Sequence, residues 1–519
     1  MPVLFNSFKC TFLLIFVLPT IESIPRRSNE PWSVVLCKFA EHPDYEPRSK
    51  DWIEKWIHGH DASIESYFDL VSNGLYTIKN SNVLGWQSLL SEPDELFNAT
   101  ELLNELDQDH FQYFDKIKEL CQQIAEKDNG AQLHRQRITI VNAGSTAVYG
   151  KKYGVLLTPQ LMFSSVLTHE MVHSFFIGHS YSDRKIRVFP YALSGEYDDR
   201  YDLMSTANAY MHRTNFGMAG PGLNGPHLDF LGWLPNDRML YFGRDGRQNY
   251  TLRLSSLSVP HNKTRGWLLV MLPYDRDNSR NFYTIELRTP QNFDRGIGQP
   301  SILIHRVQRA GESYYSVLLS QARDFYELTE GTEWIKFLEA DNHGRFQVIR
   351  VSVRKVYAND ADISVSTTFE PNDCRLGEIM KRLDSPAVGV DHVCLEKERE
   401  PTEKDEQKQI QRRSFYTSLA TYGANSCRPG FVWRLIDPYD YTCTEQFRKE
   451  AAQSELEQQE DRVLESGGCT EPFIERGAFP GDKVCVSAVE KLLVIRENAQ
   501  SSNRLRHFEF FNGVDSVGA

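Results

Sequence analysis

A histidine-rich segment of the chain reads Thr168-His169-Glu170-Met171-Val172-His173-Ser174-Phe175-Phe176-Ile177-Gly178-His179-Ser180. Residues four positions apart lie on the same face of a helix, so His169 and His173 can offer two imidazole nitrogens to one metal ion. Glu170 follows the first of these histidines, where its carboxylate can reach a metal-activated water as a general base. Gly178 allows the chain to leave the helix, and His179 comes next as the third candidate ligand.

Three protein ligands leave one position of a tetrahedral zinc ion open for water. An open position is typical of a catalytic zinc site, whereas structural zinc sites are closed. The five-residue HExxH pattern also arises by chance in chains of this length, so the features that follow it carry much of the weight. The nearest of them is Met204, which follows His179 by 25 residues (204 − 179).

With these residues the sequence resembles the metzincin clan of zinc endopeptidases, whose long motif is HExxHxxGxxH followed by a methionine-containing turn beneath the metal. Residues 196–204 are similar to the turn of the gametolysin-like and immune-inhibitor-A-like branches. The resemblance implies that Met204 is the apolar floor under the zinc. It also implies that Zn²⁺ is held by His169, His173 and His179, with Glu170 as general base.

The motif departs from the clan at one position, where Phe176 stands in place of glycine. A bulky residue tolerates a positive φ poorly, so we expect the turn to move to Gly178. If it does not move, His179 is expected to miss the metal, and Asp183 or Glu196 becomes the substitute ligand.

A second departure concerns the tyrosine that the clan often has two residues after the methionine. The corresponding residue here is Thr206. Tyr201 and Tyr210 are weak substitutes for it.

The composition is that of an ordinary globular protein. The chain has 519 residues, of which 40% are hydrophobic and 25% charged, and its length predicts two to four domains. Its net charge is 58 − 70 = −12, and no basic stretch is interleaved with aromatic residues, so nucleic acid is not an expected partner.

The first 23 residues have the pattern of a secretory signal peptide. Lys9 precedes an apolar run at residues 11–18, which is well short of the ~20 apolar residues of a membrane span. We therefore expect a secreted, extracellular protein without a membrane span. Arg26 and Arg27, in the polar stretch that follows, are interpreted as a solvated linker, with a processing site as the alternative.

Cysteines and glycosylation sequons agree with export. Eight cysteines remain after the signal peptide, and an even number in an exported chain predicts disulfides. The sequons begin at Asn98, Asn249 and Asn262. The expected pairs are Cys37 with Cys121, Cys374 with Cys394, Cys427 with Cys443, and Cys469 with Cys485.

Residues 31–235 are expected to form an α/β catalytic domain. Strand patterns at 32–37, 137–142 and 153–157 alternate with helix patterns at 51–58, 62–71 and 102–126, and the zinc helix is predicted to begin near Leu161. Segments 72–86 and 224–234 also resemble the gametolysin-like and immune-inhibitor families. His227, in the second of these segments, is interpreted as a structural or cleft residue rather than a ligand.

The fold class predicted for the whole chain is α+β, with several units after the catalytic domain. Residues 236–370 contain short strand patterns separated by turn residues, which suggests a β-sandwich. Residues 371–424 are expected to be a charged linker with one disulfide, and the apolar-poor part at 395–413 is either linker or exposed helix.

An internal repeat occupies the last part of the chain, at 425–519. The units 427–465 and 469–507 have a period of 42 residues (469 − 427), and each separates its two cysteines by 16. Each is expected to be a disulfide-stapled loop with a helical tail, since so small a unit cannot be stable on its core alone. Two interpretations stay open: a spacer, or a module that contacts the extracellular matrix or a surface.

Together these features predict a secreted, glycosylated zinc endopeptidase that acts on a protein or peptide substrate. A first alternative is a secreted binding protein with an inert or structural metal site, which acts through its carboxy-terminal repeats. Phe176 is the feature that supports it, and the intact Glu170 opposes it. A second alternative is a secreted zinc hydrolase that cleaves something other than peptide bonds.

Overall fold

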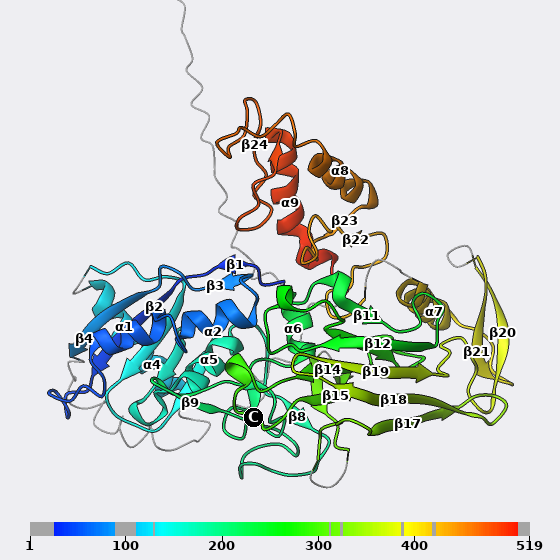
Figure 1. Cartoon of the computed structure of the whole chain (residues 1–519), viewed down its shortest axis with the longest axis horizontal. Helices are drawn as coiled ribbons and strands as arrows, with labels where there is room; N and C mark the ends of the chain where they lie inside the picture. Colours follow the sequence, from blue (N-terminus) through cyan, green and yellow to red (C-terminus); the bar gives the residue numbers. More distant parts are fainter. Residues whose placement is uncertain are drawn as a thin grey trace, which may run out of the picture.

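The computed structural model describes residues 25–88, 111–127, 130–310, 313–321, 325–385, 389–417 and 422–506. The predicted signal peptide, the sequon at Asn98 and the first part of the predicted helix 102–126 lie outside these residues. Over the described residues the chain is α+β, as predicted. Figure 1 shows an α/β unit beside a β-sandwich, with the two cysteine-containing units lying across one side of both. No helix in this part of the chain is long and apolar enough to cross a membrane.

The α/β unit is built on a five-stranded sheet with the strand order β4-β2-β5-β7-β6. The first four strands run parallel and β6 is antiparallel to β7. Its elements are β2 (Trp32–Lys38), α1 (Lys50–His58), α2 (Ile64–Val71), β4 (Asn82–Ser88), α4 (Phe111–Lys127), β5 (Gln136–Val141), β6 (Ala147–Gly150), β7 (Gly154–Leu157), α5 (Ser164–His173) and α6 (Gly225–Leu231). Two short pairs, β1 (Ser28–Asn29) with β3 (Tyr76–Thr77) and β9 (His212–Thr214) with β10 (Gly217–Ala219), lie beside it.

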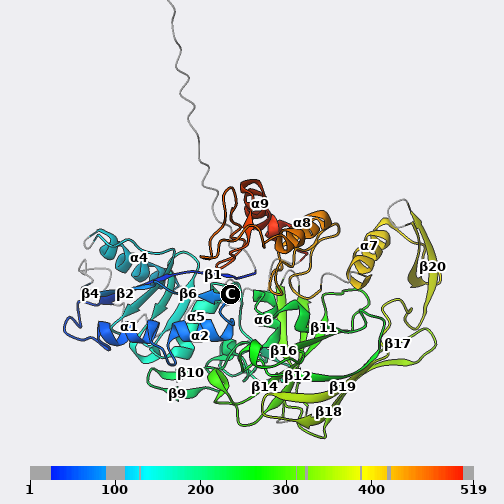
Figure 2. The same cartoon turned by 45° about the horizontal axis from the view of Figure 1, so that its top comes forward.

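Alternation along β2 divides the side chains between two cores. Val34 and Leu36 belong to the main core, on the face covered by α1, α2 and α5, whereas Val35 and Cys37 pack with α4 on the other face. Cys37 is bonded to Cys121 of α4, as expected. The sheet is therefore covered by helices on both faces, as Figure 2 also shows.

A β-sandwich follows, as the turn-separated strand patterns predicted. Its six-stranded sheet has the order β11-β13-β14-β15-β16-β8, and its four-stranded sheet the order β12-β19-β18-β17. Apolar side chains of both sheets form one buried cluster between them. The strands are β8 (Tyr181–Ser182), β11 (Met239–Tyr241), β12 (Asn249–Ser255), β13 (Leu269–Pro273), β14 (Phe282–Arg288), β15 (Ser301–Ala310), β16 (Ser313–Leu318), β17 (Glu333–Ala340), β18 (Phe346–Val356) and β19 (Asp360–Thr367).

The charged segment after the sandwich contains regular structure. The strands β20 (Glu378–Ser385) and β21 (Gly389–Glu396) form a hairpin next to the Cys374–Cys394 disulfide. Helix α7 (Glu403–Thr417) then covers much of the stretch for which linker and helix were both left open.

The two repeat units contact one another through the segments that follow their hairpins. Each has a short hairpin stapled by the predicted disulfide, Cys427–Cys443 or Cys469–Cys485. Ser501 on the helix of the second unit accepts from the backbone of Cys443, and Gln459 after the helix of the first accepts from that of Cys485. The elements are β22 (Val432–Trp433), β23 (Cys443–Thr444), α8 (Gln446–Glu457), β24 (Ile474–Glu475), β25 (Cys485–Val486) and α9 (Ala488–Arg504).

The interpretation of Arg26 and Arg27 as a solvated linker is wrong. Arg26 is 6% exposed; its guanidinium donates to the carbonyl of Ser174 and lies over the ring of Phe175. Arg27 forms an ion pair with Asp437 of the first repeat unit. The two arginines bind the amino-terminal segment to the end of the α5 segment and to the repeats, and this non-local burial leaves no pattern in the local sequence.

Candidate metal centre

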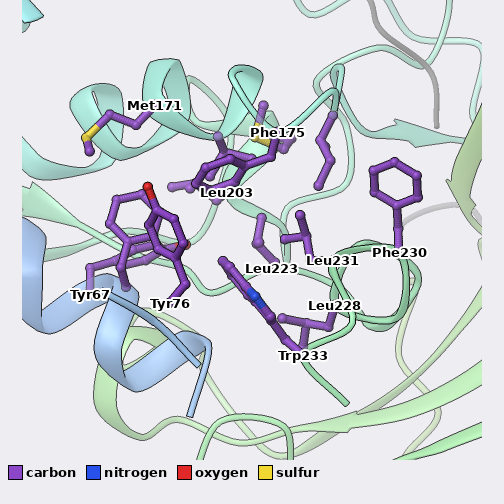
Figure 3. Packing of buried hydrophobic residues seen from close by; sticks show 14 of the residues in the cluster. Tyr67, Tyr76, Met171, Phe175, Leu203, Leu223, Leu228, Phe230, Leu231 and Trp233 are labelled. Carbon is purple, nitrogen blue, oxygen red and sulfur yellow. The ribbon is translucent and has the colours of Figure 1, made fainter. Parts of the chain in front are cut away.

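Helix α5 carries the histidine motif through the centre of the α/β unit, and all ten of its residues are buried. It begins at Ser164, three residues later than predicted (164 − 161), because Pro159–Leu161 form a separate 3₁₀ turn and Phe163 is extended. Just beyond the helix, the ring of Phe175 packs against the rings of Tyr76 and Trp233 (Figure 3), and Met171 is buried in the same main core. This packing fixes the position of α5 and with it the orientation of the helix face that carries His169 and His173.

The chain turns at Phe176, so the expectation that the turn moves to Gly178 is wrong. Phe176 itself adopts a φ of 63°, and Gly178 is not among the described residues with positive φ. The side chain of Phe176 is half-buried against the main core. We attribute the tolerance of a left-handed aromatic residue to this burial, since apolar contact offsets a conformational cost of about 1–3 kcal/mol. The chain thereby reaches His179 with a bulky residue at the position where the clan has glycine.

The structure brings the three histidines together. His169, His173 and His179 each offer one nitrogen, and these atoms lie within 4.8 Å of one another. His179 therefore does not miss the group, although the turn is made at Phe176. Of the three, His169 and His173 are buried and His179 is partly exposed, so the group opens on the side of His179.

Every Nδ1 of the group is held by an acceptor. Nδ1 of His169 donates to the carbonyl of Leu203 at 3.1 Å, and Nδ1 of His173 donates to that of Ile177 at 2.8 Å. Nδ1 of His179 lies 2.6 Å from a carboxylate oxygen of Glu196. In a neutral ring such a bond places the proton on Nδ1 and leaves Nε2 to face the group, which is how metal-binding histidines are oriented.

The donor set fits a bound cation. Nε2 of His169 and Nε2 of His173 lie 3.1 Å apart, although each ring already carries its proton on the other nitrogen. Two lone pairs at this distance repel one another unless a cation or an added proton lies between them. Three imidazole nitrogens are a ligand set that zinc accepts, with one position left open.

Burial keeps two of the rings neutral. Burial and the neighbouring His179 lower the pKa of His169 to about 3, and burial together with the other two histidines lowers that of His173 well below its usual range. Nε2 of His169 and Nε2 of His173 are therefore unprotonated at neutral pH, which is the state that binds a metal.

Glu170 directly follows His169 on α5, and its carboxyl group lies against the edge of the sheet. Burial raises the pKa of Glu170 to about 8, while the backbone N–H of Tyr149 and the Lys118 ammonium act in the opposite direction. The N–H of Tyr149 comes from β6, so the carboxylate is tethered to the edge strand. A buried carboxylate with a raised pKa is suited to accept and return a proton near neutral pH.

Met204 lies in a 3₁₀ turn, Leu203–Ser205, that packs against α5. Its side chain is fully buried in the main core. The backbone carbonyl of Met204 accepts from Ser180, the residue after the third histidine, at 3.3 Å. The methionine turn is thus bonded to the segment that carries His179.

The substitute ligands named from the sequence are not needed. Glu196 supports His179 rather than replacing it: one carboxylate oxygen contacts Nδ1 and the other accepts from the backbone of Leu193 at 2.6 Å. Burial alone would raise the pKa of Glu196, but these bonds outweigh it and the net shift is downward. Asp183 accepts from the backbone of Ser320 instead.

Tyr197 is a site residue that the sequence interpretation missed. Its hydroxyl lies 3.0 Å from Nε2 of His179, and its ring packs on the imidazole with centroids 4.1 Å apart. Tyr197 has a φ of 60°. The one sequence signal was its place beside Glu196, within the segment similar to the methionine turns.

The tyrosines considered in its place lie elsewhere. The Tyr201 hydroxyl bonds Glu327, and the ring of Tyr210 packs on Tyr201. Thr206 donates to the carbonyl of Leu203.

His227 belongs to a buried layer beneath the methionine turn. It is 1% exposed, and its Nδ1 lies 2.6 Å from Asp202, which also accepts from Ser180. The structure thus gives His227 a supporting position, in line with its interpretation as a structural residue.

Comparison of the chain with models of protein families, with curated proteins and with solved structures finds no match. The case for a metal centre therefore depends on the convergence of three histidine nitrogens whose opposite ring nitrogens are all hydrogen-bonded.

Proposed function

We propose that the chain is a zinc-dependent endopeptidase of the metzincin type. One observation carries the proposal: His169, His173 and His179 converge on one point, and the buried Glu170 follows His169 on the same helix. A purely structural site does not need that carboxyl group, and it would be closed by a fourth protein ligand.

The chain's residues divide the work of hydrolysis. A zinc ion held by the three histidines would supply Lewis acidity, which acidifies a water and polarises the substrate carbonyl. Glu170 accepts a proton from the water while the water oxygen forms a bond to the carbonyl carbon of the substrate. As the carbon–nitrogen bond breaks, Glu170 returns the proton to the leaving amine. We assign to the hydroxyl of Tyr197, 3.0 Å from Nε2 of His179, the donation of a hydrogen bond to the developing oxyanion.

The edge strand next to Glu170 favours a peptide as the substrate. Within the described residues, β6 is the last strand on its side of the sheet. The N–H of Tyr149 in this strand points to the carboxyl group of Glu170, so the outer edge of β6 runs past the catalytic base. An extended peptide can add to such an edge through main-chain hydrogen bonds, which brings its carbonyl groups near the metal.

Export and glycosylation belong to the same proposal. All eight cysteines outside the first 24 residues form disulfides, which persist in oxidising compartments. The sequon residues Asn249 and Asn262 are exposed and accessible to a glycan. Exposed apolar residues on α9, such as Val489 and Leu492, are consistent with a repeat module that makes surface contacts.

Mass spectrometry of a casein digest tests the proposal. We expect new peptides whose termini derive from hydrolysis of internal peptide bonds, and we expect them to be absent after treatment with a chelator. Zinc binding without new termini, together with hydrolysis of a simple ester, would favour the alternative of a hydrolase for other bonds. Zinc binding without any hydrolysis would favour the binding protein.

A further inference from the structure

The β-sandwich supports the segment that follows the third histidine. Strand β8, Tyr181–Ser182, begins two residues after His179 and pairs in parallel with β16 at Val317 and Leu318. The backbone N–H of Asp183 then donates to the carbonyl of Leu318 at 2.9 Å. The chain that leaves His179 is therefore an edge strand of the six-stranded sheet.

Arg288, at the end of β14 in the same sheet, reaches the methionine turn. It is 1% exposed, and its guanidinium donates to both carboxylate oxygens of Asp294 at 2.9 and 2.6 Å. The remaining nitrogen donates to the backbone carbonyl of Tyr201 at 2.8 Å and, at 3.2 Å, to that of Leu223. Arg288 thus joins the sheet to two segments of the α/β unit.

A chain of hydrogen bonds connects Arg288 to the first ligand. Asp294 accepts from the backbone of Gly222 at 2.9 Å, and the carbonyl of Gly222 accepts from the backbone of Leu203 at 3.0 Å. The carbonyl of Leu203 is the acceptor that orients His169. Arg288 therefore fixes the Leu203 carbonyl by two routes, through the Tyr201 carbonyl two residues earlier and through Asp294 and Gly222.

His305 of β15 holds the same turn from a second point. It is fully buried, and its Nε2 lies 2.9 Å from Asp199, while its Nδ1 lies 3.5 Å from Glu286. Glu286 in turn accepts from the backbone of Gly225 at the start of α6. Two strands of the sandwich thus contact the segment 199–201 before the methionine turn and the start of α6 through buried polar side chains.

We propose that Arg288 is a positioning residue for the metal centre and that the sandwich sets the orientation of two of its three ligands, His169 and His179. His173 is different, because its Nδ1 bonds the carbonyl of Ile177 in its own turn. The role of Arg288 rests on one part of the proposed function, namely that the three histidines bind zinc. It does not depend on which reaction the zinc site catalyses. Supporting residues of metal-bound histidines typically change metal affinity by 10–100-fold.

The test compares zinc affinity and ligand geometry in full-length variants. Zinc dissociation constants are measured against a competing chelator, and the visible spectrum of the Co²⁺-loaded protein reports the ligand geometry. We expect Arg288→Met to weaken zinc binding by about 10–100-fold and to shift the Co²⁺ bands, because the Leu203 carbonyl loses its fixed position. Arg288→Lys retains the charge but not the paired donors, so we expect an intermediate affinity.

Arg434→Met is the matched control. Arg434 is also 1% exposed and also pairs through two nitrogens with an aspartate, Asp440, but it lies in the first repeat unit. The variant Arg434→Met should lower the urea midpoint of unfolding about as much as Arg288→Met does, and it should leave the zinc affinity unchanged. If Arg288→Met does not fold, Asp294→Asn is measured in its place. This change keeps an acceptor for the backbone of Gly222 and weakens the contact with Arg288. We expect it to bind zinc several-fold more weakly than wild type.

The outcomes separate the two proposals. A folded Arg288→Met protein, or a folded Asp294→Asn protein where that one is used, with wild-type zinc affinity and an unchanged Co²⁺ spectrum overturns the role of Arg288. Wild-type protein that binds zinc but cleaves nothing overturns only the proposed endopeptidase function. The role of Arg288 is still tested in that case, because the zinc affinity of the variants can still be measured. Wild-type protein that binds no zinc overturns both.

Discussion

The hydroxyl of Tyr197 lies 3.0 Å from Nε2 of His179, the nitrogen through which that histidine would bind a metal. The tyrosine comes from the segment before the methionine turn, and its ring packs on the imidazole. Tyr197 and Phe176, on either side of His179 in the sequence, both have positive φ. Strained residues of this kind are concentrated at functional sites, so the position of Tyr197 favours a role in turnover.

We expect Tyr197→Phe to lower kcat by about 10²-fold while KM and the zinc dissociation constant change little. The reason is that loss of one donor to an oxyanion costs roughly this factor, whereas the phenyl ring still packs on His179. Steady-state kinetics on a fluorogenic peptide, with a zinc titration, provide the measurement. Tyr191→Phe is the control, because Tyr191 is 58% exposed and packs on Phe189 rather than on a ligand. Equal kcat for wild type and Tyr197→Phe would contradict the assignment.

Glu196 is expected to control metal affinity through His179. Its carboxylate accepts from Nδ1, so Glu196→Ala removes the acceptor that fixes the third ring and should weaken zinc binding about 10–100-fold. Asp183→Ala removes a carboxylate from the same loop that bonds the backbone of Ser320 instead, and it should leave zinc affinity unchanged. Chelator competition measures both. If Asp183→Ala has the larger effect, the roles given to the two carboxylates are reversed.

Asp229 predicts a pH dependence of stability at the contact between α6 and the segment that leads into the repeats. Burial raises its pKa to about 7, against a hydrogen bond from the backbone of Ala424. Because the folded protein binds this proton more tightly than the unfolded chain, the free energy of unfolding falls as pH rises from about 4 to about 7. The effect reaches at most about 4 kcal/mol, since one pKa unit corresponds to about 1.4 kcal/mol.

Asp229→Asn keeps an acceptor for Ala424 and cannot ionise. We expect the variant to be more stable than wild type at pH 8 and about equally stable at pH 4, as measured by urea unfolding at both values. A stability difference that does not change with pH would contradict the raised pKa of Asp229.

The sequence predicted the features that depend on local spacing. The four-residue interval from His169 to His173 places both rings on one face of a helix, and equal cysteine intervals in two repeats predicted the pairs that are observed. The sandwich was predicted from short strand patterns between turn residues, because each strand is itself a local feature.

The features that were missed depend on contacts between distant segments. Phe176 makes the turn because its ring packs against the main core. The free energy of this burial comes from residues distant in the sequence, so rules for local backbone conformation do not predict it. Arg288 lies 87 residues from Tyr201, so no local pattern linked the sandwich to the metal centre. Zinc binding, proteolysis and export stay predictions.

The most direct test of the central claim is zinc content and casein cleavage of full-length protein, measured for wild type, wild type with chelator, and Glu170→Ala. The account predicts about one zinc per chain in both proteins, cleavage by wild type that the chelator abolishes, and no cleavage by Glu170→Ala, because the metal ligands persist without the base. Glu170→Ala protein that cleaves casein at the wild-type rate, or wild-type protein that holds no zinc, would contradict it.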